Sequence, residues 1–298
     1  MYGPLTAPAV GIVLKELVRR AIALIRSHRI GFEVFDKAGH DGRPDLFTSA
    51  DLAAQHSYLR MLRECFPGYG IVAEEDGLRV PCTLDGVEAY FTVDPLDGTR
   101  AFARGQSFGV ATQVALVVDG QVIAAYIGDV CTHEIYGYRP ESPKVHRISE
   151  YETATDLNQV DRARPLNQQT ALLREPPEDH HPLIAALVQP VARHGTTRGY
   201  EITSGSIGIS MSRLWKGEVG MHVLTAGMDT PWDNTPIIGM AERLNLVWLR
   251  PSPDGTRLVP WRPEPPVTSC PRDFDAVLAP ASVAADLERW CAHRDRAN

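Results

Sequence analysis

The length, composition and charge of this chain set the first limits on its class. It has 298 residues, of which 44% are hydrophobic and 22% are charged, and its formal net charge is −7. Such a composition is typical of a soluble globular protein with room for one large domain or two, and it argues against wholesale disorder. The acidic balance disfavours a general nucleic-acid or anionic-membrane surface, so we expect neither partner.

The five cysteines are scattered along the chain and form no C-x-x-C pair. This pattern argues against a disulfide framework and against a zinc site, and it indicates reduced thiols. The start of the sequence lacks the basic residues and the continuous apolar core of a signal peptide, and no stretch approaches the length of a membrane span. We therefore expect a cytoplasmic protein.

The first half of the chain predicts two helices followed by several strands. Apolar residues at helical spacing indicate a helix over residues 8–28, and a second helix over 48–66 is stopped by Pro67-Gly68. Apolar and β-rich runs predict strands, and Asp119-Gly120 is a strong two-residue hairpin turn between two of them. The predicted strands cover residues 71–73, 108–118, 121–129 and 132–138.

The second half alternates helices with strands. Residues 139–182 are rich in Pro, Glu, Arg, Gln and His, and they predict a partly mobile domain boundary. Beyond it, Ser204 or Ser206 is suited to cap a helix that ends at Trp215. The remaining predicted helices cover residues 182–194, 230–244 and 282–292, and the predicted strands cover 221–225 and 275–279. We therefore expect an α+β domain over 1–150 and an α/β domain over 151–298.

One loop stands out for its chemistry, because an apolar strand ends in the sequence Asp94-Pro-Leu-Asp97-Gly98-Thr99. The two carboxylates supply hard oxygen ligands for a divalent cation, and Pro95 stiffens the bend. Gly98 lets the backbone approach an anion, which Thr99 can also hydrogen-bond at the start of a short helix. An Asx-rich surface turn is the alternative, and it would suffice for a bare D-x-x-D. The longer string favours function.

Acidic residues at three other places have the same two interpretations. Glu74 and Glu75 follow the strand at 71–73, and a strand end in solvent explains them equally well. Asp51 in Thr48-Ser-Ala-Asp51 and Asp233 in Thr230-Pro-Trp-Asp233 both fit a capping box, which would fix them in the first turn of a helix without any ligand.

The order of these motifs, which spans most of the chain, resembles the inositol monophosphatase superfamily of magnesium-dependent phosphatases. The resemblance implies an α/β fold, layered as an αβαβα sandwich. It implies that two or three Mg²⁺ ions are bound by four carboxylates and one backbone carbonyl, those of Glu74, Asp94, Asp97, Asp233 and Leu96. It also implies that Gly98 and Thr99 hold the phosphate, and that Thr99, Glu74 and Asp51 position and activate the attacking water.

Other positions bear on the substrate. By the same resemblance, Gly205, Ser206 and Ile207 line the substrate pocket together with Asp97 and Asp233. Inositol phosphatases place a glutamate where this chain has Ala226, and they end the following helix with a stretch that differs from residues 239–245 here. The segment from Asp97 to Phe102 is closer to the histidinol-phosphatase branch. These departures argue against inositol phosphate itself as the substrate.

The remaining polar candidates are weaker. Lys37 corresponds, by resemblance, to a lysine near the third metal. Trp232 is expected to be a core anchor beside the site. The histidines match no metal-ligand spacing, and we expect core or surface roles for His180, His181, His194 and His222.

The sequence therefore predicts a Mg²⁺-dependent phosphomonoesterase. Its expected substrate is a small phosphorylated metabolite, such as a sugar, cyclitol, histidinol or nucleoside phosphate. The nearest alternative is a 3′(2′),5′-bisphosphate nucleotidase, and the alternative of another class is a non-catalytic relative that binds phosphorylated metabolites or a partner protein. The resemblance also implies a homodimer and sensitivity to lithium.

Overall fold

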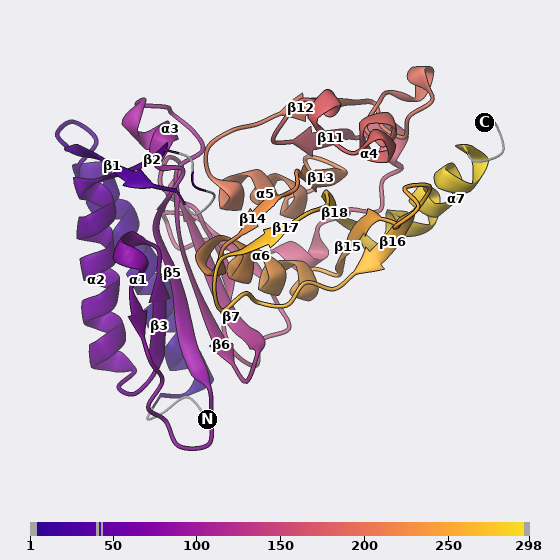
Figure 1. The fold of residues 1–298 in the computed structure, drawn as a ribbon. Helices are drawn as coiled ribbons and strands as arrows, with labels where there is room; N and C mark the ends of the chain where they lie inside the picture. The colour runs from indigo at the N-terminus through magenta and orange to yellow at the C-terminus, as the bar shows by residue number, and fades with distance from the viewer. Residues whose placement is uncertain (1–4, 40–41, 43, 295–298) are drawn as a thin grey trace.

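Two β-sheets separate three layers of helices in the computed structural model, which describes residues 5–39, 42 and 44–294 (Figure 1). From left to right in Figure 1, α1 and α2 are followed by the first sheet, then by α5 and α6, the second sheet, and finally α4 and α7. The αβαβα sandwich expected from the sequence is confirmed.

The first layer consists of α1 (Ala7–Ser27) and α2 (Ser49–Cys65), close to the predicted ranges. Thr6 caps α1 by accepting a hydrogen bond from the backbone N–H of Ala9, and Thr48 caps α2. The apolar faces of both helices pack on the first sheet in one core. Between them, β1 (Val34–Ala38) and β2 (Pro44–Thr48) form an antiparallel hairpin, where the sequence analysis assigns no strand.

The first sheet has eight strands in the order β10-β9-β8-β7-β6-β5-β3-β4, and only β3 and β5 pair in parallel. The turn at Asp119-Gly120 joins β6 to β7, and both residues have the positive φ that this two-residue turn requires. The strands are β3 (Gly70–Ala73), β4 (Arg79–Val80), β5 (Ala89–Asp97), β6 (Ala111–Val118), β7 (Gln121–Asp129), β8 (Ile135–Tyr138), β9 (His146–Ile148) and β10 (Ala154–Asp156).

The segment 139–182, where the composition indicates a boundary, carries regular strands. Its first part adds β9 and β10 to the first sheet, and its last part supplies β11 (Thr170–Leu173) of the second sheet. The chain therefore passes from one sheet to the other between Asp156 and Thr170. The division at residue 150 remains a prediction.

The second sheet has six strands in the order β12-β11-β13-β18-β15-β16. Successive residues of its strands face opposite cores: Leu172, Leu224 and Leu278 face the middle layer, whereas their neighbours Leu173, Val223 and Val277 face the outer one. Its remaining strands are β12 (Gly199–Ile202), β13 (Met221–Leu224), β15 (Leu246–Pro251), β16 (Leu258–Trp261) and β18 (Ala276–Pro280), and a separate pair is formed by β14 (Gly227–Asp229) and β17 (Cys270–Arg272).

The middle helices, α5 (Ile207–Trp215) and α6 (Pro231–Arg243), belong to the second half of the chain, but α6 also packs against β5, β6 and β7 of the first sheet. Trp232 is 2% exposed in this middle core, as predicted. The sheets thus share one apolar layer, which fixes the start of α6 against the end of β5. This contact positions the site described below.

The outer layer contains α4 (Pro182–Leu187) and α7 (Ala284–Arg294). The helix predicted over 182–194 is shorter than expected, because Pro190 has no N–H and disfavours helical backbone at the residue before it. Short helices fill the loops: α3 (Thr99–Ala103), and the 3₁₀ turns η1 (Glu75–Gly77), η2 (Leu157–Gln159), η3 (Leu166–Gln168), η4 (Pro177–Asp179), η5 (Val191–Arg193) and η6 (Ala281–Val283). Within the described residues, every helix is too short or too polar to cross a bilayer.

Candidate metal centre

Three carboxylates from distant parts of the chain meet where β5 ends and α6 begins. One carboxylate oxygen from each of Asp94, Asp97 and Asp233 lies within 4.8 Å of the others. In the part of the chain that the structure describes, this is the one group of three or more His, Cys, Asp or Glu side chains with such spacing. Hard oxygen ligands at this separation suit a divalent cation such as Mg²⁺.

A bulge in β5 lets Asp94 and Asp97 share the site. In a regular strand, residues three apart point to opposite faces. Here Asp94 pairs with Gln113 and Asp97 pairs with Ala111, so β5 advances by three residues over a stretch in which β6 advances by two. The additional residue restores a common direction for the two carboxylates, and Pro95 within the bulge has no N–H to leave unpaired.

Three ionised carboxylates are unfavourable in this cluster without a cation, because burial removes them from water and they repel one another. Burial raises the pKa of Asp94 well above its usual range, and the charges of Glu74, Asp233 and Asp97 raise it further. Burial also raises the pKa of Asp233 to about 7, with the charges of Asp97 and Glu74 adding to the effect. Oδ1 of Asp94 is buried and has no hydrogen-bond partner among the described residues. A bound cation would satisfy this oxygen and relieve the repulsion.

Asp97 connects the two halves of the molecule. Its carboxylate accepts hydrogen bonds from the Ser206 hydroxyl at 2.5 Å, the Gln113 amide at 2.7 Å and the backbone N–H groups of Gly208 and Ile207 at 3.0 and 3.2 Å. Burial raises the pKa of Asp97, and the hydrogen bonds from Ser206 and Gly208 partly oppose the rise. The negative charge therefore sits at the N-terminus of α5, where the helix dipole favours it.

Gly98 and Thr99 follow the carboxylates in a tight turn. Gly98 has φ 90°, and a Cβ at this position would lie 2.2 Å from the carbonyl oxygen of Gly109. Only glycine fits both the backbone conformation and the space. The Thr99 hydroxyl lies 3.0 Å from the carbonyl oxygen of Leu96 and 3.1 Å from Oδ1 of Asp51. The structure thus places Thr99 beside Asp51, with which the resemblance pairs it.

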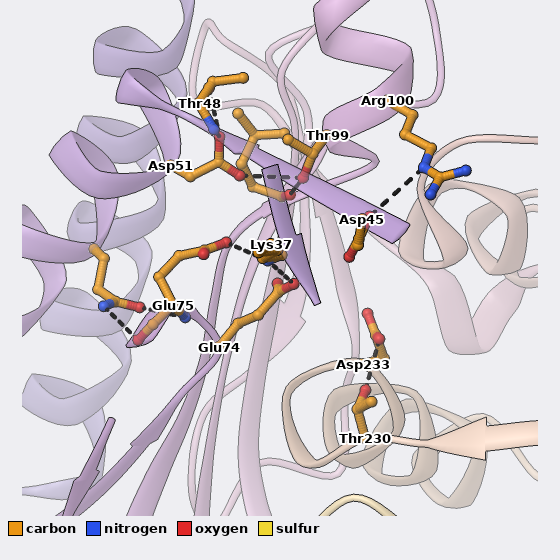
Figure 2. A network of polar contacts seen from close by, with 12 residues as sticks. Lys37, Asp45, Thr48, Asp51, Glu74, Glu75, Thr99, Arg100, Thr230 and Asp233 are labelled. Carbon is orange, nitrogen blue, oxygen red and sulfur yellow. Dashed lines mark hydrogen bonds and ion pairs between the residues drawn. The ribbon is translucent and has the colours of Figure 1, made fainter. Parts of the chain in front are cut away.

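Asp51 is fully buried and lies outside the acidic trio. Its Oδ2 accepts hydrogen bonds from the N–H of Thr48 at 2.7 Å and from the Thr48 hydroxyl at 2.5 Å, and so completes a capping box on α2 (Figure 2). Burial raises the pKa of Asp51 to about 6, although the hydrogen bonds from Thr48 oppose this rise. Asp51 is therefore a helix-capping residue, as the capping-box pattern predicts. It also accepts a hydrogen bond from Thr99, and its catalytic role stays a prediction.

Glu74 is the predicted ligand that the structure does not bring into the trio. Figure 2 shows Lys37 between Glu74 and Glu75, and the Lys37 ammonium lies 2.9 Å from Glu74 and 2.8 Å from Glu75. Burial alone would lower the pKa of Lys37, but the two carboxylates raise it, so the ammonium stays charged. The charge of Glu74 nevertheless raises the pKa of Asp94 and of Asp233.

A pocket of about 540 Å³ opens beside Asp97 and Asp233. Of the predicted substrate residues at 205–207, only Ile207 lines it, since Ser206 is fully buried against Asp97. The other lining residues come from the ends of β11, β13, η4 and β17, from β14 and from the start of α6: Arg174, Glu175, Asp179, Leu224, Thr225, Ala226, Gly227, Met228, Asp229, Asn234 and Arg272.

Sequence reasoning missed several polar residues of this site. Gln113 holds Asp97, and the one signal for it is a polar side chain in the apolar run of β6. The Thr230 hydroxyl donates a hydrogen bond to Asp233 at 2.6 Å, whereas the capping-box pattern predicts that Asp233 accepts from the backbone N–H of Thr230 (Figure 2).

Of the histidines, His180 is buried against Asp275 and His222 is buried in the core, whereas His194 is exposed.

The fold and the site together define a class: a five-layered α/β protein with a carboxylate-lined cation site at the junction of its halves. The sequence model of the inositol monophosphatase family matches residues 9–194. The chain belongs to the inositol monophosphatase family. The matched range contains Asp94, Asp97 and Thr99, whereas Asp233 lies beyond it.

Curated relatives match shorter stretches. An inositol-1-monophosphatase of Caulobacter vibrioides is 35% identical over 86 residues, which are 28% of this chain and 31% of that protein. The Nus factor SuhB of Xylella fastidiosa is 30% identical over 129 residues, which are 43% of this chain and 44% of that protein. The matches thus span less than half the length of these relatives.

Solved structures match over nearly the full length. An IMPase/NADP phosphatase complexed with Mg²⁺ and phosphate has a TM-score of 0.66 at 17% identity, covering 96% of both chains. The extragenic suppressor protein suhB from Bartonella henselae has a TM-score of 0.66 at 17% identity, covering 95% of this chain and 98% of the other. At this identity the likeness concerns the fold.

Proposed function

We propose that this protein is a Mg²⁺-dependent phosphomonoesterase acting on a small phosphorylated metabolite. The observation that carries the proposal is the trio of Asp94, Asp97 and Asp233, whose oxygens approach within 4.8 Å beside a pocket of about 540 Å³. Family membership adds the reaction class, and solved relatives are described as complexed with Mg²⁺ and phosphate and as bound with D-inositol-1-phosphate.

The trio, the Leu96 carbonyl and Glu74 are the groups we assign to hold the metal. When bound, Mg²⁺ neutralises phosphate charge and acidifies water in phosphoryl-transfer sites. Lys37 contacts only Oε1 of Glu74, so Glu74 would engage the metal through Oε2 or by leaving Lys37 to Glu75. Lys37 then holds the second glutamate away from the ions and limits the negative charge of the site.

The protein's own groups orient the phosphate and the water. The turn at Gly98 brings backbone N–H groups to the N-terminus of α3, and Thr99 presents its hydroxyl there. Thr99 donates to Asp51, so a proton taken from the attacking water by the Thr99 oxygen can pass to the Asp51 carboxylate. The raised pKa of Asp51, about 6 because of burial, suits a group that accepts a proton near neutral pH.

The substrate class remains broad: a sugar, cyclitol, histidinol or nucleoside phosphate. Ala226 lines the pocket without a carboxylate to bind hydroxyl groups, which disfavours inositol phosphate. A 3′(2′),5′-bisphosphate nucleotidase is the alternative within the same chemistry. We also keep the homodimer and the cytoplasmic location as predictions.

A phosphate-release screen with purified protein tests the proposal. With Mg²⁺ we expect turnover of at least one phosphomonoester from these classes, and we expect EDTA to abolish it. Asp97→Asn should abolish turnover in the same assay, with circular dichroism showing whether the fold is kept. Turnover that survives EDTA would contradict a metal-dependent reaction.

The rival of another class is a non-catalytic protein that binds phosphorylated metabolites or a partner protein. Relatives named Nus factor SuhB are the observation in its favour. If no ester of the panel releases phosphate with Mg²⁺, while the same esters raise the melting temperature, the binding role replaces the enzymatic one.

A further inference from the structure

We propose that Arg174 makes the pocket selective for phosphomonoesters that carry a second anionic group, a carboxylate or another phosphate, close to the scissile one. The inference rests on the proposed function, because it concerns the substrate of the same site. It depends on how Arg174 is held, on the partners of the other charged residues in the pocket, and on the uncharged part of the pocket wall.

Arg174 follows the last residue of β11 and lines the pocket together with Asp97 and Asp233. Its guanidinium donates to the carbonyl oxygen of Gly205 at 2.8 Å and to the Ser210 hydroxyl at 3.4 Å. Both acceptors are neutral, and among the described residues Arg174 forms no ion pair. A guanidinium has five N–H donors, so these two contacts leave donors for a ligand.

The second arginine of the pocket shows the contrast. Arg272 is 8% exposed and pairs with Asp229 at 3.1 Å, and its other nitrogens donate to the carbonyl oxygens of Phe274 and Thr225. Its charge and its donors are therefore committed within the protein. Arg174 is the arginine of this pocket that forms no ion pair with a described residue, although its charge lowers the pKa of Asp97.

The other charges do not cancel Arg174. Asp229 is committed to Arg272, and a bound cation would balance Asp97 and Asp233. Glu175 and Asp179 are exposed, where water screens them.

The pocket wall from Leu224 to Met228 contributes no charge. A substrate anchored by its scissile phosphate at the metal site would therefore meet Arg174 as the available cation. A carboxylate or phosphate forms bidentate, charge-assisted hydrogen bonds with a guanidinium, which a hydroxyl cannot match. The pocket, at about 540 Å³, is within the size range of small-molecule sites.

Two matched pairs of esters test the proposal and distinguish the two sources of the second anion. 3-Phosphoglycerate is compared with glycerol 3-phosphate, and adenosine 3′,5′-bisphosphate with adenosine 5′-monophosphate. For the wild type we expect the member of at least one pair that carries the second anionic group to have the higher kcat/KM. In Arg174→Gln the preference should fall about 10- to 100-fold, the value of one charge-assisted hydrogen bond, and Arg174→Lys should restore part of it.

A control variant separates the site from the general charge of the protein. Arg198 directly precedes β12 and donates to the hydroxyl of Thr170, the first residue of β11, and Arg198→Gln removes the same charge outside the pocket. We expect the preference to be unchanged in this control. An unchanged preference in Arg174→Gln, or an equal fall for both members of each pair, would overturn the proposal and leave Arg174 as a support of Gly205.

Binding measured without turnover separates this proposal from the proposed function. The dissociation constants of the four esters are determined by calorimetry with Ca²⁺ in place of Mg²⁺. If the wild type binds the members with the second anionic group more tightly and Arg174→Gln does not, selection by Arg174 stands even where no phosphate is released. Turnover without any such difference in binding or in kcat/KM would contradict the role of Arg174 and leave the phosphatase intact.

Discussion

Asp51 and Asp233 occupy the same position in the same sequence pattern, Thr-x-x-Asp at the start of a helix, yet the structure uses them differently. At α2, Asp51 turns back to the N–H of Thr48 and closes a capping box. At α6, the N–H of Thr230 is taken at 3.0 Å by Asn234, and Asp233 is left to face Asp94 and Asp97.

The difference is decided one residue beyond the pattern. The residue after Asp51 is Leu52, which offers no acceptor, whereas the residue after Asp233 is Asn234. Because Asn234 satisfies the first free N–H of the helix, the carboxylate of Asp233 is released for another role. A capping motif therefore does not distinguish a structural aspartate from a metal ligand until the competing acceptors are counted.

The largest expected effect is on activity at Asp233. Asp233→Ala should lower kcat by at least about 10³-fold, equivalent to about 4 kcal/mol, because it removes one of the four carboxylates that we assign to the metal. Its free energy of unfolding without metal should be unchanged or slightly higher, since one buried like charge is gone. Phosphate release and urea unfolding measure the two quantities, and a fully active variant would remove Asp233 from the metal site.

The converse is expected for stability at Asp51. Asp51→Ala should lower the free energy of unfolding by about 2 kcal/mol, because the Thr48 and Thr99 hydroxyls and the Thr48 N–H lose their acceptor. Urea unfolding of the metal-free protein compares it with Asp233→Ala. Equal stability of the two variants would break the distinction between the two aspartates.

We expect Asp51 to contribute to the pH dependence of the free energy of unfolding. Burial raises the pKa of Asp51 to about 6, from its ordinary value of 3.8. Between pH 4 and 6 the folded protein holds a proton that the unfolded chain has released, so the free energy of unfolding falls as pH rises through this window. The contribution is at most about 1.4 kcal/mol per pH unit.

Asp51→Asn tests this point, because it removes the titrating group. Urea unfolding of the metal-free variant should show a flatter profile than the wild type between pH 4 and 6. The exposed Asp85→Asn is the control, and its profile should follow the wild type. An identical slope in Asp51→Asn would show that Asp51 does not titrate in this range.

The smallest effect tests the reason for the difference. Asn234→Leu introduces at α6 the residue type that follows Asp51 in α2. The N–H of Thr230 then loses its acceptor, and Asp233 becomes the nearest side chain that can cap α6. Since about one hydrogen bond then competes with the metal, Mg²⁺ affinity should fall roughly 5- to 10-fold. Calorimetric titration with Mg²⁺ measures it, and the reciprocal Leu52→Asn should leave the affinity unchanged.

Local patterns predicted many elements correctly. The apolar period of 3.6 predicted α1 and α2, and the turn chemistry of Asp119-Gly120 predicted the hairpin of β6 and β7. β6 begins at Ala111 rather than at residue 108, because Gly109 has φ 73° and interrupts the extended backbone before it. Ser206 caps α5 as expected, and the motif at 94–99 indicated a site.

Other features were beyond local patterns. The hairpin of β1 and β2 is short, with β1 largely exposed and β2 mostly half-buried, and neither strand shows the alternation of buried and exposed residues that sequence patterns detect. The ion pairs of Lys37 with Glu74 and Glu75 join residues 37 and 38 positions apart, and no spacing rule predicts them. Likewise, the sequence does not show that Arg174 forms no ion pair with a described residue, because this depends on where the fold places the acidic side chains.

The sequence by itself determined the apolar faces of the helices, the hairpin turn at Asp119-Gly120 and the left-handed turn at Gly98, because each depends mainly on residues close together in the chain. It also supplied the acidic residues from which a metal site could be built. Only the tertiary structure decided which carboxylates meet. The bulge in β5 and the packing of α6 against the first sheet bring Asp94, Asp97 and Asp233 together across more than 130 residues. Electrostatic repulsion between buried carboxylates depends on these distances through space, which the order of residues does not contain.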